Sequence, residues 1–469
     1  MRTLDTPVKQ IRRKIFAEVA KLGFQSTDAS LIHDIEAIPY NIVQERAQYR
    51  ESIYRERAVA SERVRLAMGL SLRPENKAVH LTAGVEASNI DEKYYEPPLM
   101  QVIPSACSAC PSNMYEVSNM CRGCVAHPCM QVCPKGAISM VNGKSHIDQS
   151  KCIKCGKCKS VCPYDAIAHK ERPCERACGV KAIESDERGR AQINQSKCVS
   201  CGMCMVSCPF GAISDKSQIF QLAHALREGN EIIAEVALGA DIGAISEAHH
   251  YANEVATGHL PFLLTSCCPS WSMLAKKQFS AMIDNISREL TPMVATARSV
   301  KKEHPNAKVV FIGPCAAKKL EAMRTSVRSD VDFVITFEEL WGLFDAKEIN
   351  PAEIEPSASL HNATAAGRGY AVAGGVAGAI EACLKEYYPD VPVHIEHAES
   401  LAECKKMLTL AKVGKLNGCM IEGMACPGGC MGGAGTNAPF AKASKALKSY
   451  LASSTEKLPA KELEDLELN

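Results

Sequence analysis

Cysteine is the residue type with the most chemical potential in this sequence. The chain has 24 cysteines among 469 residues, and they occur in tight groups. Sixteen lie between residues 101 and 215, and eight follow residue 215. Thiolate sulfur is a soft, anionic ligand that suits iron–sulfur clusters and zinc. A chain of this length does not depend on disulfides, and its first residues lack the apolar core of an export signal. The CxxC pairs therefore favour metal binding over disulfides.

The two strongest local patterns are runs of four cysteines with two-residue gaps, each closed by Cys-Pro. They extend from Cys152 to Cys162 and from Cys198 to Cys208. This spacing is typical of bacterial ferredoxins, in which three thiolates hold one 4Fe-4S cluster and the fourth holds the neighbouring cluster. Zinc is the alternative metal, but the four-cysteine run with its terminal proline favours iron–sulfur binding.

An internal repeat extends this interpretation to the whole cysteine-rich region. Residues 133–158 resemble residues 178–204, and each copy contains a hairpin-like stretch before the sequence Gln-Ser-Lys-Cys. Cys121 opens a third run with a wider middle gap. Cys174 and Cys178 lack a preceding CxxC pair, so Cys107 and Cys110 are assigned to that site by elimination. Crosswise ligation then predicts four accessory 4Fe-4S sites: Cys121, Cys124, Cys129 with Cys162; Cys152, Cys155, Cys158 with Cys133; Cys198, Cys201, Cys204 with Cys178; and Cys107, Cys110, Cys174 with Cys208.

Three further motifs lie after residue 215, and each follows a predicted buried strand. They are Thr-Ser-Cys-Cys-Pro-Ser-Trp from 265, Gly-Pro-Cys-Ala-Ala-Lys-Lys from 313 and Glu-Gly-Met-Ala-Cys-Pro-Gly-Gly-Cys from 422. The carboxyl ends of parallel strands meet at one crevice, where open α/β sheets bind ligands. One cysteine from each of the first two motifs and a CxxxC pair from the third would supply four thiolates for one more cluster.

These three motifs, in this order behind a ferredoxin-like region, resemble those of iron-only (FeFe) hydrogenases. The resemblance covers about residues 105–440 and implies an H-cluster, a 4Fe-4S cubane joined to a diiron subsite that carries CO, cyanide and azadithiolate. It implies interconversion of H2 with protons and electrons, with the electrons relayed through the accessory clusters. The implied roles are cubane ligation by Cys268, Cys315, Cys426 and Cys430, bridging to the diiron site by Cys430, proton transfer by Cys267, Glu247 and Ser287, a hydrogen bond to cyanide from Lys318, and packing by Met424.

Several positions depart from the familiar family pattern. Gly313 stands where well-known members have Met, Ser270 where they have Gly, and His250 and Glu254 occupy the outer proton relay. The connection between Cys208 and Cys267 is also short and lacks the Ala-Pro-x-x-Arg segment that lines the diiron pocket in relatives. Residues 233–240 read as if two segments were fused. The sequence therefore resembles a less typical branch of the family.

The remaining pattern predicts three regions. Residues 1–100 are a helical N-terminal region, with helical spacing from 43 to 70 and a favourable pair between Glu51 and Arg55. Residues 101–215 are a ferredoxin-like α+β region, and residues 216–469 are an α/β H-cluster domain. Short strands are expected at 261–265, 308–313, 333–336, 391–396 and 419–423. Alternation of strands with helices predicts parallel sheets covered by helices. Cys383, Cys404 and Cys419 are expected to be buried apolar side chains.

The composition limits the function classes. The formal net charge of +1 gives no bulk attraction to nucleic acid or to an anionic membrane, and no apolar run could span a bilayer. We expect a cytoplasmic protein of an anaerobe that exchanges electrons with ferredoxin and needs hydrogenase maturation proteins. The alternatives are a hydrogenase-like iron–sulfur assembly scaffold without a diiron site, an H2 sensor and a polyferredoxin subunit. Cys267 and Lys318 argue against the scaffold, since cubane binding alone requires neither of them.

Overall fold

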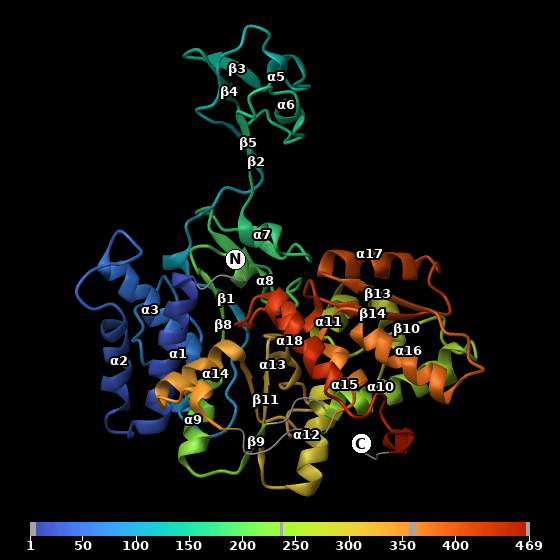
Figure 1. The fold of residues 1–469 in the computed structure, drawn as a ribbon. Helices are drawn as coiled ribbons and strands as arrows, with labels where there is room; N and C mark the ends of the chain where they lie inside the picture. Colours follow the sequence, from blue (N-terminus) through green and yellow to red (C-terminus); the bar gives the residue numbers. More distant parts are fainter. Residues whose placement is uncertain (1–5, 235–237, 356–362, 466–469) are drawn as a thin grey trace.

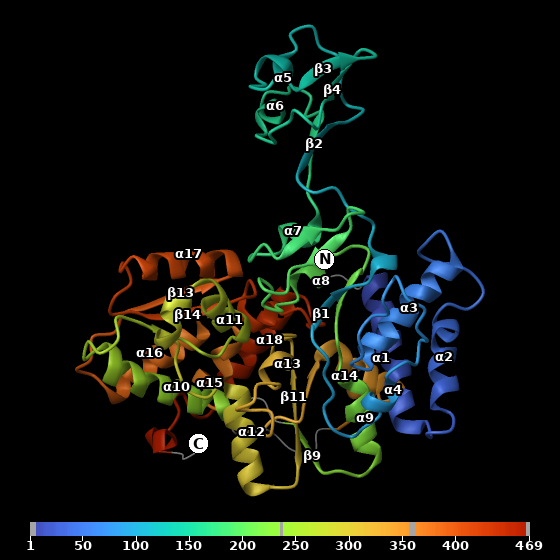
Figure 2. The same ribbon diagram turned by 180° about the vertical axis from the view of Figure 1, so that it is seen from behind.

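The computed structural model describes residues 6–234, 238–355 and 363–465. A broad body carries most of the helices and strands, and a small lobe formed by residues 114–170 stands apart from it (Figure 1). The view from behind shows the same separation, with α1–α3 and α16–α17 on opposite flanks of the body (Figure 2). Residues 101–215 therefore contribute both to the lobe and to the middle of the body.

The N-terminal region is helical, as predicted. It contains α1 (Pro7–Gln25), α2 (Leu31–Ile42), α3 (Ile53–Ala67) and the short α4 (Val85–Ser88). Helix α1 begins where Thr6 accepts a hydrogen bond from the backbone N–H of Lys9 at 3.4 Å, with Pro7 in the first turn. The prediction of helix from residue 43 was wrong over its first ten residues, because the 43–52 segment is a loop ahead of α3. Glu51 and Arg55 do form the expected ion pair.

The cysteine-rich region is built from short antiparallel pairs. Strand β1 (Met100–Val102) pairs with β8 (Ile213–Asp215) at the base of the region, and β2 (Met114–Val117) pairs with β5 (Ile167–Lys170) to form the stalk of the lobe (Figure 1). The predicted hairpins are β3 (Ile138–Val141) with β4 (Lys144–Ile147), and β6 (Ile183–Ser185) with β7 (Ala191–Ile193). Four short helices follow cysteine turns: α5 (Pro128–Gln131), α6 (Lys157–Ser160), α7 (Pro173–Arg176) and α8 (Met203–Ser207).

The C-terminal half contains the predicted parallel sheets. One sheet has the order β12 (Phe333–Thr336), β11 (Lys308–Gly313) and β9 (Ile232–Ala234); the other has the order β10 (Leu263–Leu264), β14 (Met420–Met424) and β13 (Ile395–Glu399). The strands expected at 308–313 and 333–336 have the predicted bounds, whereas the one expected at 391–396 is shifted to 395–399.

Helices cover both parallel sheets. They are α9 (Ile219–Arg227), α10 (Leu238–His250), α11 (Pro269–Gln278), α12 (Pro292–Glu303), α13 (Lys318–Glu321), α14 (Phe337–Ala346), α15 (Ala365–Arg368), α16 (Gly375–Tyr387), α17 (Leu401–Lys412) and α18 (Phe440–Ala452). Within the described residues, no helix is both long enough and apolar enough to cross a membrane.

A buried ion-pair network joins the N-terminal helices to the C-terminal half. The ammonium of Lys319 lies 2.8 Å from carboxylate oxygens of both Asp215 and Glu339, and Arg12 on α1 lies 2.8 Å from Glu338. Ile15 and Phe220 share one apolar core with Phe333, so helices α1 and α9 pack on the sheet that contains β12. The N-terminal helices are thus part of the body that positions the cysteine motifs.

Candidate active site and cluster sites

The lobe brings together two of the predicted cysteine sets. Both sets line small cavities between the short helices and the hairpin, in the arrangement that crosswise ligation requires. The first cavity is lined by Cys121, Cys124, Cys129 and Cys162, and the second by Cys133, Cys152, Cys155 and Cys158. The chain places four sulfur atoms around each cavity, which is the donor set of a 4Fe-4S cluster.

The base of the cysteine-rich region brings together the other two sets. One cavity is lined by Cys107, Cys110, Cys174 and Cys208, including the CxxC pair that was assigned by elimination. The second set, Cys178, Cys198, Cys201 and Cys204, gathers around one apolar cluster near α8. Among the residues that the structure describes, no three His, Cys, Asp or Glu side chains are arranged to hold a single metal ion.

In each of the four sets, the cysteine that comes from the neighbouring run or its equivalent accepts the same local hydrogen bond. The backbone N–H of the residue four positions later donates to its sulfur atom. The pairs are Ala137 to Cys133 at 3.3 Å, Ala166 to Cys162 at 3.4 Å, Ala182 to Cys178 at 3.1 Å and Ala212 to Cys208 at 3.3 Å. Such N–H donors stabilise negative charge on the sulfur and raise the reduction potential of a cluster. The repeat seen in the sequence is therefore also a repeat of sulfur environment.

The three C-terminal motifs converge on one cavity of about 590 Å³. Cys268 precedes α11 directly, Cys315 follows β11, and Cys426 follows β14. The cavity is lined by all the cysteines predicted for the H-cluster and by the other residues implied to contact it: Cys267, Cys268, Cys315, Cys426, Cys430, Lys318 and Met424. As expected for parallel strands, the motifs meet at the carboxyl ends of strands.

One wall of the cavity depends on close packing between two backbone segments. Gly429 has a φ of +77°, and a Cβ atom there would lie 2.5 Å from the backbone nitrogen of Ala373. Only glycine tolerates both the left-handed backbone and this close approach. Four thiol donors around a cavity of this size fit a cubane with an attached subsite, and the candidate ligands are Cys268, Cys315, Cys426 and Cys430.

Cluster sites adjoin one another between the base of the cysteine-rich region and this cavity. Cys201 also lines the large cavity. Burial raises the pKa of the Cys201 thiol, and the cysteines Cys178, Cys198 and Cys268 add smaller contributions, so Cys268 lies near Cys201. Cys174 in turn lies close enough to Cys204 to raise the pKa of that thiol. The set of Cys178 is therefore the neighbour of the H-cluster cavity, and the set of Cys107 lies beyond it.

A buried thiol and a buried carboxyl group lie beside the cavity. Burial, together with the nearby Glu247 carboxylate, raises the pKa of the Cys267 thiol well above its usual range. Burial raises the pKa of Glu247 to about 7, although the backbone N–H of Ser266 and the neighbouring Ser287 hydroxyl favour the charged form. A carboxyl group with this pKa can both accept and donate a proton near neutral pH.

Polar groups continue from Glu247 away from the cavity. Glu247 Oε1 accepts hydrogen bonds from the backbone N–H and the hydroxyl of Ser266, at 3.1 and 3.3 Å. Ser287 accepts a hydrogen bond from the backbone N–H of Glu289 at 3.3 Å, and His250 Nδ1 lies 3.3 Å from the Glu289 carboxylate. His250 and Glu289 are both partly exposed. These groups connect a buried acid with the surface of the molecule.

Lys318 supplies a cation to the cavity. Its ammonium lies 2.7 Å from the Glu321 carboxylate and donates a hydrogen bond to the Thr291 hydroxyl at 3.2 Å. Burial alone would lower the pKa of Lys318, but the contact with Glu321 raises it above its ordinary value. Lys318 is therefore charged at neutral pH and is a donor for an anionic ligand of the cofactor.

Tyr370 is a cavity residue that the sequence interpretation missed. It lines the H-cluster cavity, and its hydroxyl is buried without a hydrogen-bond partner among the described residues. Burial raises its pKa far above the usual range, and the nearby Glu247 and Cys267 add to the rise. No spacing pattern marks this tyrosine, because the Gly-rich segment around it carries no motif that was assigned to the site.

The remaining expectations have mixed outcomes. Cys383 and Cys404 are fully buried as predicted, whereas Cys419 is only half-buried. The join expected within 233–240 falls partly on residues 235–237, which lie outside the described residues. Its first part, Ile232–Ala234, is strand β9, which pairs in parallel with β11. The expectation that the short connection leaves the diiron pocket without one wall therefore stays a prediction.

Comparison with known proteins agrees with this arrangement. Residues 203–434 match the model of the C-terminal domain of the iron-only hydrogenase large subunit, and residues 145–168 and 191–214 match the 4Fe-4S binding domain. NADP-reducing hydrogenase subunit HndD of Solidesulfovibrio fructosivorans is 26% identical over an alignment of 378 residues, and the match covers 67% of this chain and 62% of that protein. Iron hydrogenase 1 of Clostridium pasteurianum is 27% identical over an alignment of 254 residues, and the match covers 45% of this chain and 44% of that protein.

The chain thus spans less than two thirds of the length of either relative. A solved FeFe-hydrogenase structure from Chlamydomonas reinhardtii matches 49% of this chain and 78% of its own, with 22% identity and a TM-score of 0.39. The motifs and the family match indicate 4Fe-4S clusters and an H-cluster. The chain is an iron-only hydrogenase-like protein, and its match to the family's C-terminal domain covers residues 203–434, just under half of its length.

Proposed function

We propose that this protein interconverts H2 with protons and electrons and exchanges those electrons with ferredoxin through its accessory clusters. The observation that supports this most is the pairing of Cys267 with Glu247 beside the cavity of the four cubane cysteines. A scaffold for cubanes alone has no use for a buried thiol, a buried acid of pKa about 7 and a buried lysine at one cavity.

The H-cluster, when bound, supplies the metal site at which H2 is formed or split. Cys267 holds a proton on its sulfur atom, because its raised pKa keeps the thiol neutral. Glu247 exchanges that proton, since its own pKa lies near the working pH. Ser266 and Ser287 orient the carboxylate, and the His250–Glu289 pair connects the path with solvent.

The other cavity residues hold and enclose the cofactor. Cys268, Cys315, Cys426 and Cys430 would hold the cubane, and Cys430 would also hold the diiron subsite. Lys318 would donate a hydrogen bond to a cyanide ligand, and Met424, which is 3% exposed, would close the cavity against water.

Electrons pass between the cavity and the accessory cluster sites. The set of Cys178 adjoins the cavity, the set of Cys107 follows it, and the two sets of the lobe stand farthest out (Figure 1). A projecting lobe with two cluster sites is well placed to meet a small carrier protein. Ferredoxin is the proposed carrier, the cytoplasm the proposed location, and hydrogenase maturation proteins the proposed source of the diiron subsite.

The direct test is H2-dependent reduction of ferredoxin by the matured protein. We expect saturable turnover with ferredoxin and only slow direct reduction of NAD or NADP. Efficient nicotinamide reduction by the pure chain would contradict the choice of carrier, and HndD is named as an NADP-reducing subunit.

A second candidate is an iron–sulfur assembly scaffold. The short connection between Cys208 and Cys267, without the Ala-Pro-x-x-Arg segment, supports it, because a pocket that lacks one wall would not retain a diiron subsite. If the protein is an assembly scaffold, we expect five cubanes and no H2 turnover after maturation. Cys267→Ala would then leave every measurable property of the clusters unchanged.

A further inference from the structure

A second large cavity lies between the N-terminal helices and the base of the cysteine-rich region. Its volume is about 490 Å³, within the usual range for small-molecule sites. The first turns of α1 and the outer face of α3 form one side, and the Cys208-Pro209-Phe210 turn forms the other. This cavity is distinct from the four cluster sites and from the H-cluster cavity, but it adjoins both. Cys208, Pro209 and Phe210 also line a cluster site, and Thr436 also lines the H-cluster cavity.

The cavity is cationic. Five of its lining residues are basic, namely Lys9, Arg12, Lys14, Arg50 and Arg63, and two are acidic, namely Glu56 and Glu338. The Glu56 carboxylate is occupied by three backbone N–H groups, those of Gln48, Tyr49 and Arg50, at 2.5 to 3.1 Å. The Glu338 carboxylate pairs with Arg12. With five basic and two acidic side chains, the lining keeps an excess of positive charge.

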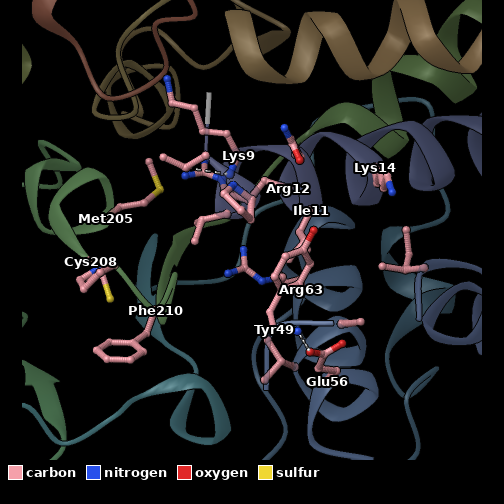
Figure 3. Close-up of a pocket in the computed structure, with 18 of the residues that line it drawn as sticks. Lys9, Ile11, Arg12, Lys14, Tyr49, Glu56, Arg63, Met205, Cys208 and Phe210 are labelled. Atoms are coloured by element: carbon pink, nitrogen blue, oxygen red, sulfur yellow. Dashed lines mark hydrogen bonds between the residues drawn. The ribbon is translucent and has the colours of Figure 1, made fainter. Parts of the chain in front are cut away.

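Arg63 is the most exceptional of these cations. Figure 3 shows it in the middle of the lining residues, between Cys208 and Phe210 on one side and Ile11 and Tyr49 on the other. It is 5% exposed, and its guanidinium contacts no carboxylate that the structure describes. Its Nη2 donates to the carbonyl oxygen of Gly211, while its Nε–H has no hydrogen-bond partner among the described residues.

An unpaired buried guanidinium is costly. Burial and the nearby Arg12 and Arg50 lower the pKa of Arg63 to about 9, so it still carries its charge at neutral pH. Proteins pair buried charges or neutralise them. The rest of the cavity lining is largely apolar and includes Val8, Ile11 and Val59. A ligand that pairs with the Arg63 guanidinium and also packs against the apolar lining has one anionic group and an apolar body.

We propose that this cavity binds a small organic anion, a carboxylate or phosphate monoester with an apolar group, whose charged end lies on Arg63. The bidentate geometry of guanidinium suits either kind of anion. The apolar body then lies against α1 and α3, and Phe210 and Tyr49 lie at the rim, where they are 39% and 52% exposed.

The site is linked to a cluster ligand. Arg63 donates to the Gly211 carbonyl, and the N–H of the same peptide unit, on Ala212, donates to the Cys208 sulfur at 3.3 Å. A cation on the carbonyl polarises this peptide and strengthens its N–H···S bond. An anion on Arg63 weakens that effect, so it lowers the reduction potential of the cluster at Cys208. This second step rests on the ligand assignment of Cys208.

The test is calorimetric titration of the cluster-reconstituted full chain with phenyl phosphate, benzoate and neutral benzyl alcohol. We expect saturable binding of at least one anion, no binding of the alcohol, and affinity about ten- to hundred-fold weaker in Arg63→Met. Arg55→Met is the matched control, because Arg55 lies on the same helix outside the cavity and contacts Ser105 and Glu51, which do not line it; this variant should bind like the natural protein. Val8→Phe fills the cavity without removing charge and should also weaken binding.

Several results would overturn the site: no saturable binding of either anion, equal binding of the alcohol, or equal affinity in Arg63→Met and Arg55→Met. Redox titration followed by electron paramagnetic resonance tests the link. One accessory cluster should shift to lower potential with the bound anion and in Arg63→Met, while the others stay constant. Unchanged potentials of all clusters would overturn the coupling. Neither measurement depends on H2 turnover, so the proposed hydrogenase function and this site can fail separately.

Discussion

The replacement of Glu247 by glutamine tests the proton path most sharply. Glutamine keeps the size and hydrogen-bonding capacity of the side chain, but it cannot carry a proton between Cys267 and solvent. A positioned acid–base group contributes about 10²–10⁴-fold in rate. We therefore expect H2 turnover of Glu247→Gln to fall by a factor of that order, while the cubane and diiron signals persist.

The structure also gives this substitution an effect on stability. Burial raises the pKa of Glu247 from 4.5 to about 7, which corresponds to about 3 kcal/mol against the ionised form in the folded state. Because the folded pKa is raised, the loss of stability develops between pH 4.5 and pH 7 and is complete above pH 7. The free energy of unfolding of Glu247→Gln, relative to the natural protein, should thus be higher at pH 8 than at pH 5 by about 2 kcal/mol.

The assays are H2 turnover across pH 6–9 and denaturant unfolding at pH 5 and pH 8. The natural protein should show an inflection in kcat/KM near pH 7 that the variant lacks. Glu396→Gln is the control, since Glu396 is an exposed carboxylate on β13 in the same domain. Turnover of Glu247→Gln like that of the control would refute the relay, and a pH-independent difference in stability would refute the raised pKa.

Four further outcomes are expected. Cys267→Ala should retain the cubane and its diiron partner but lose nearly all turnover, whereas Cys268→Ala should lose the cubane, as iron analysis and infrared spectra would show; equal cluster loss in both would mean that the two roles are misassigned. Reconstituted protein should contain about twenty irons in five cubanes, and a value near twelve would break the repeat argument. Joint replacement of Cys107 and Cys110 should remove only one cluster by the same analysis. Lys319→Met should lower the free energy of unfolding by about 3–5 kcal/mol, because it leaves the buried Glu339 carboxylate without its cation and Asp215 with only the more distant Arg12. A loss below about 1 kcal/mol in denaturant unfolding would contradict this.

The sequence predicted the parts of the fold that local pattern controls. The strands at 308–313 and 333–336 are short buried apolar runs, and the structure has them with those bounds. The hairpins of the repeat also follow local turn signals. The strand expected at 391–396 is shifted, because its pairing with β14 sets its register, and pairing between distant segments is not a local property.

The residues of the candidate sites also differ in how far the sequence could predict them. Cysteine spacing predicted three of the accessory sets, and elimination added Cys107 and Cys110 to the fourth. The structure gathers three of the four sets at one cavity each and the set of Cys178 around an apolar cluster. Tyr370 and Arg63 have no such signature. Each was found only because tertiary packing buries a polar group without a partner, and a sequence carries no record of which groups burial leaves unpaired.

The central claim is that the cavity of Cys268, Cys315, Cys426 and Cys430 holds an H-cluster with its diiron subsite. Infrared spectroscopy of the full chain after treatment with the maturation proteins tests it most directly, because protein groups do not absorb where metal-bound CO and cyanide do. We predict CO and cyanide bands that change on exposure to H2. A spectrum without these bands, from protein whose five cubanes are complete, would contradict the claim and leave the assembly scaffold as the account of this chain.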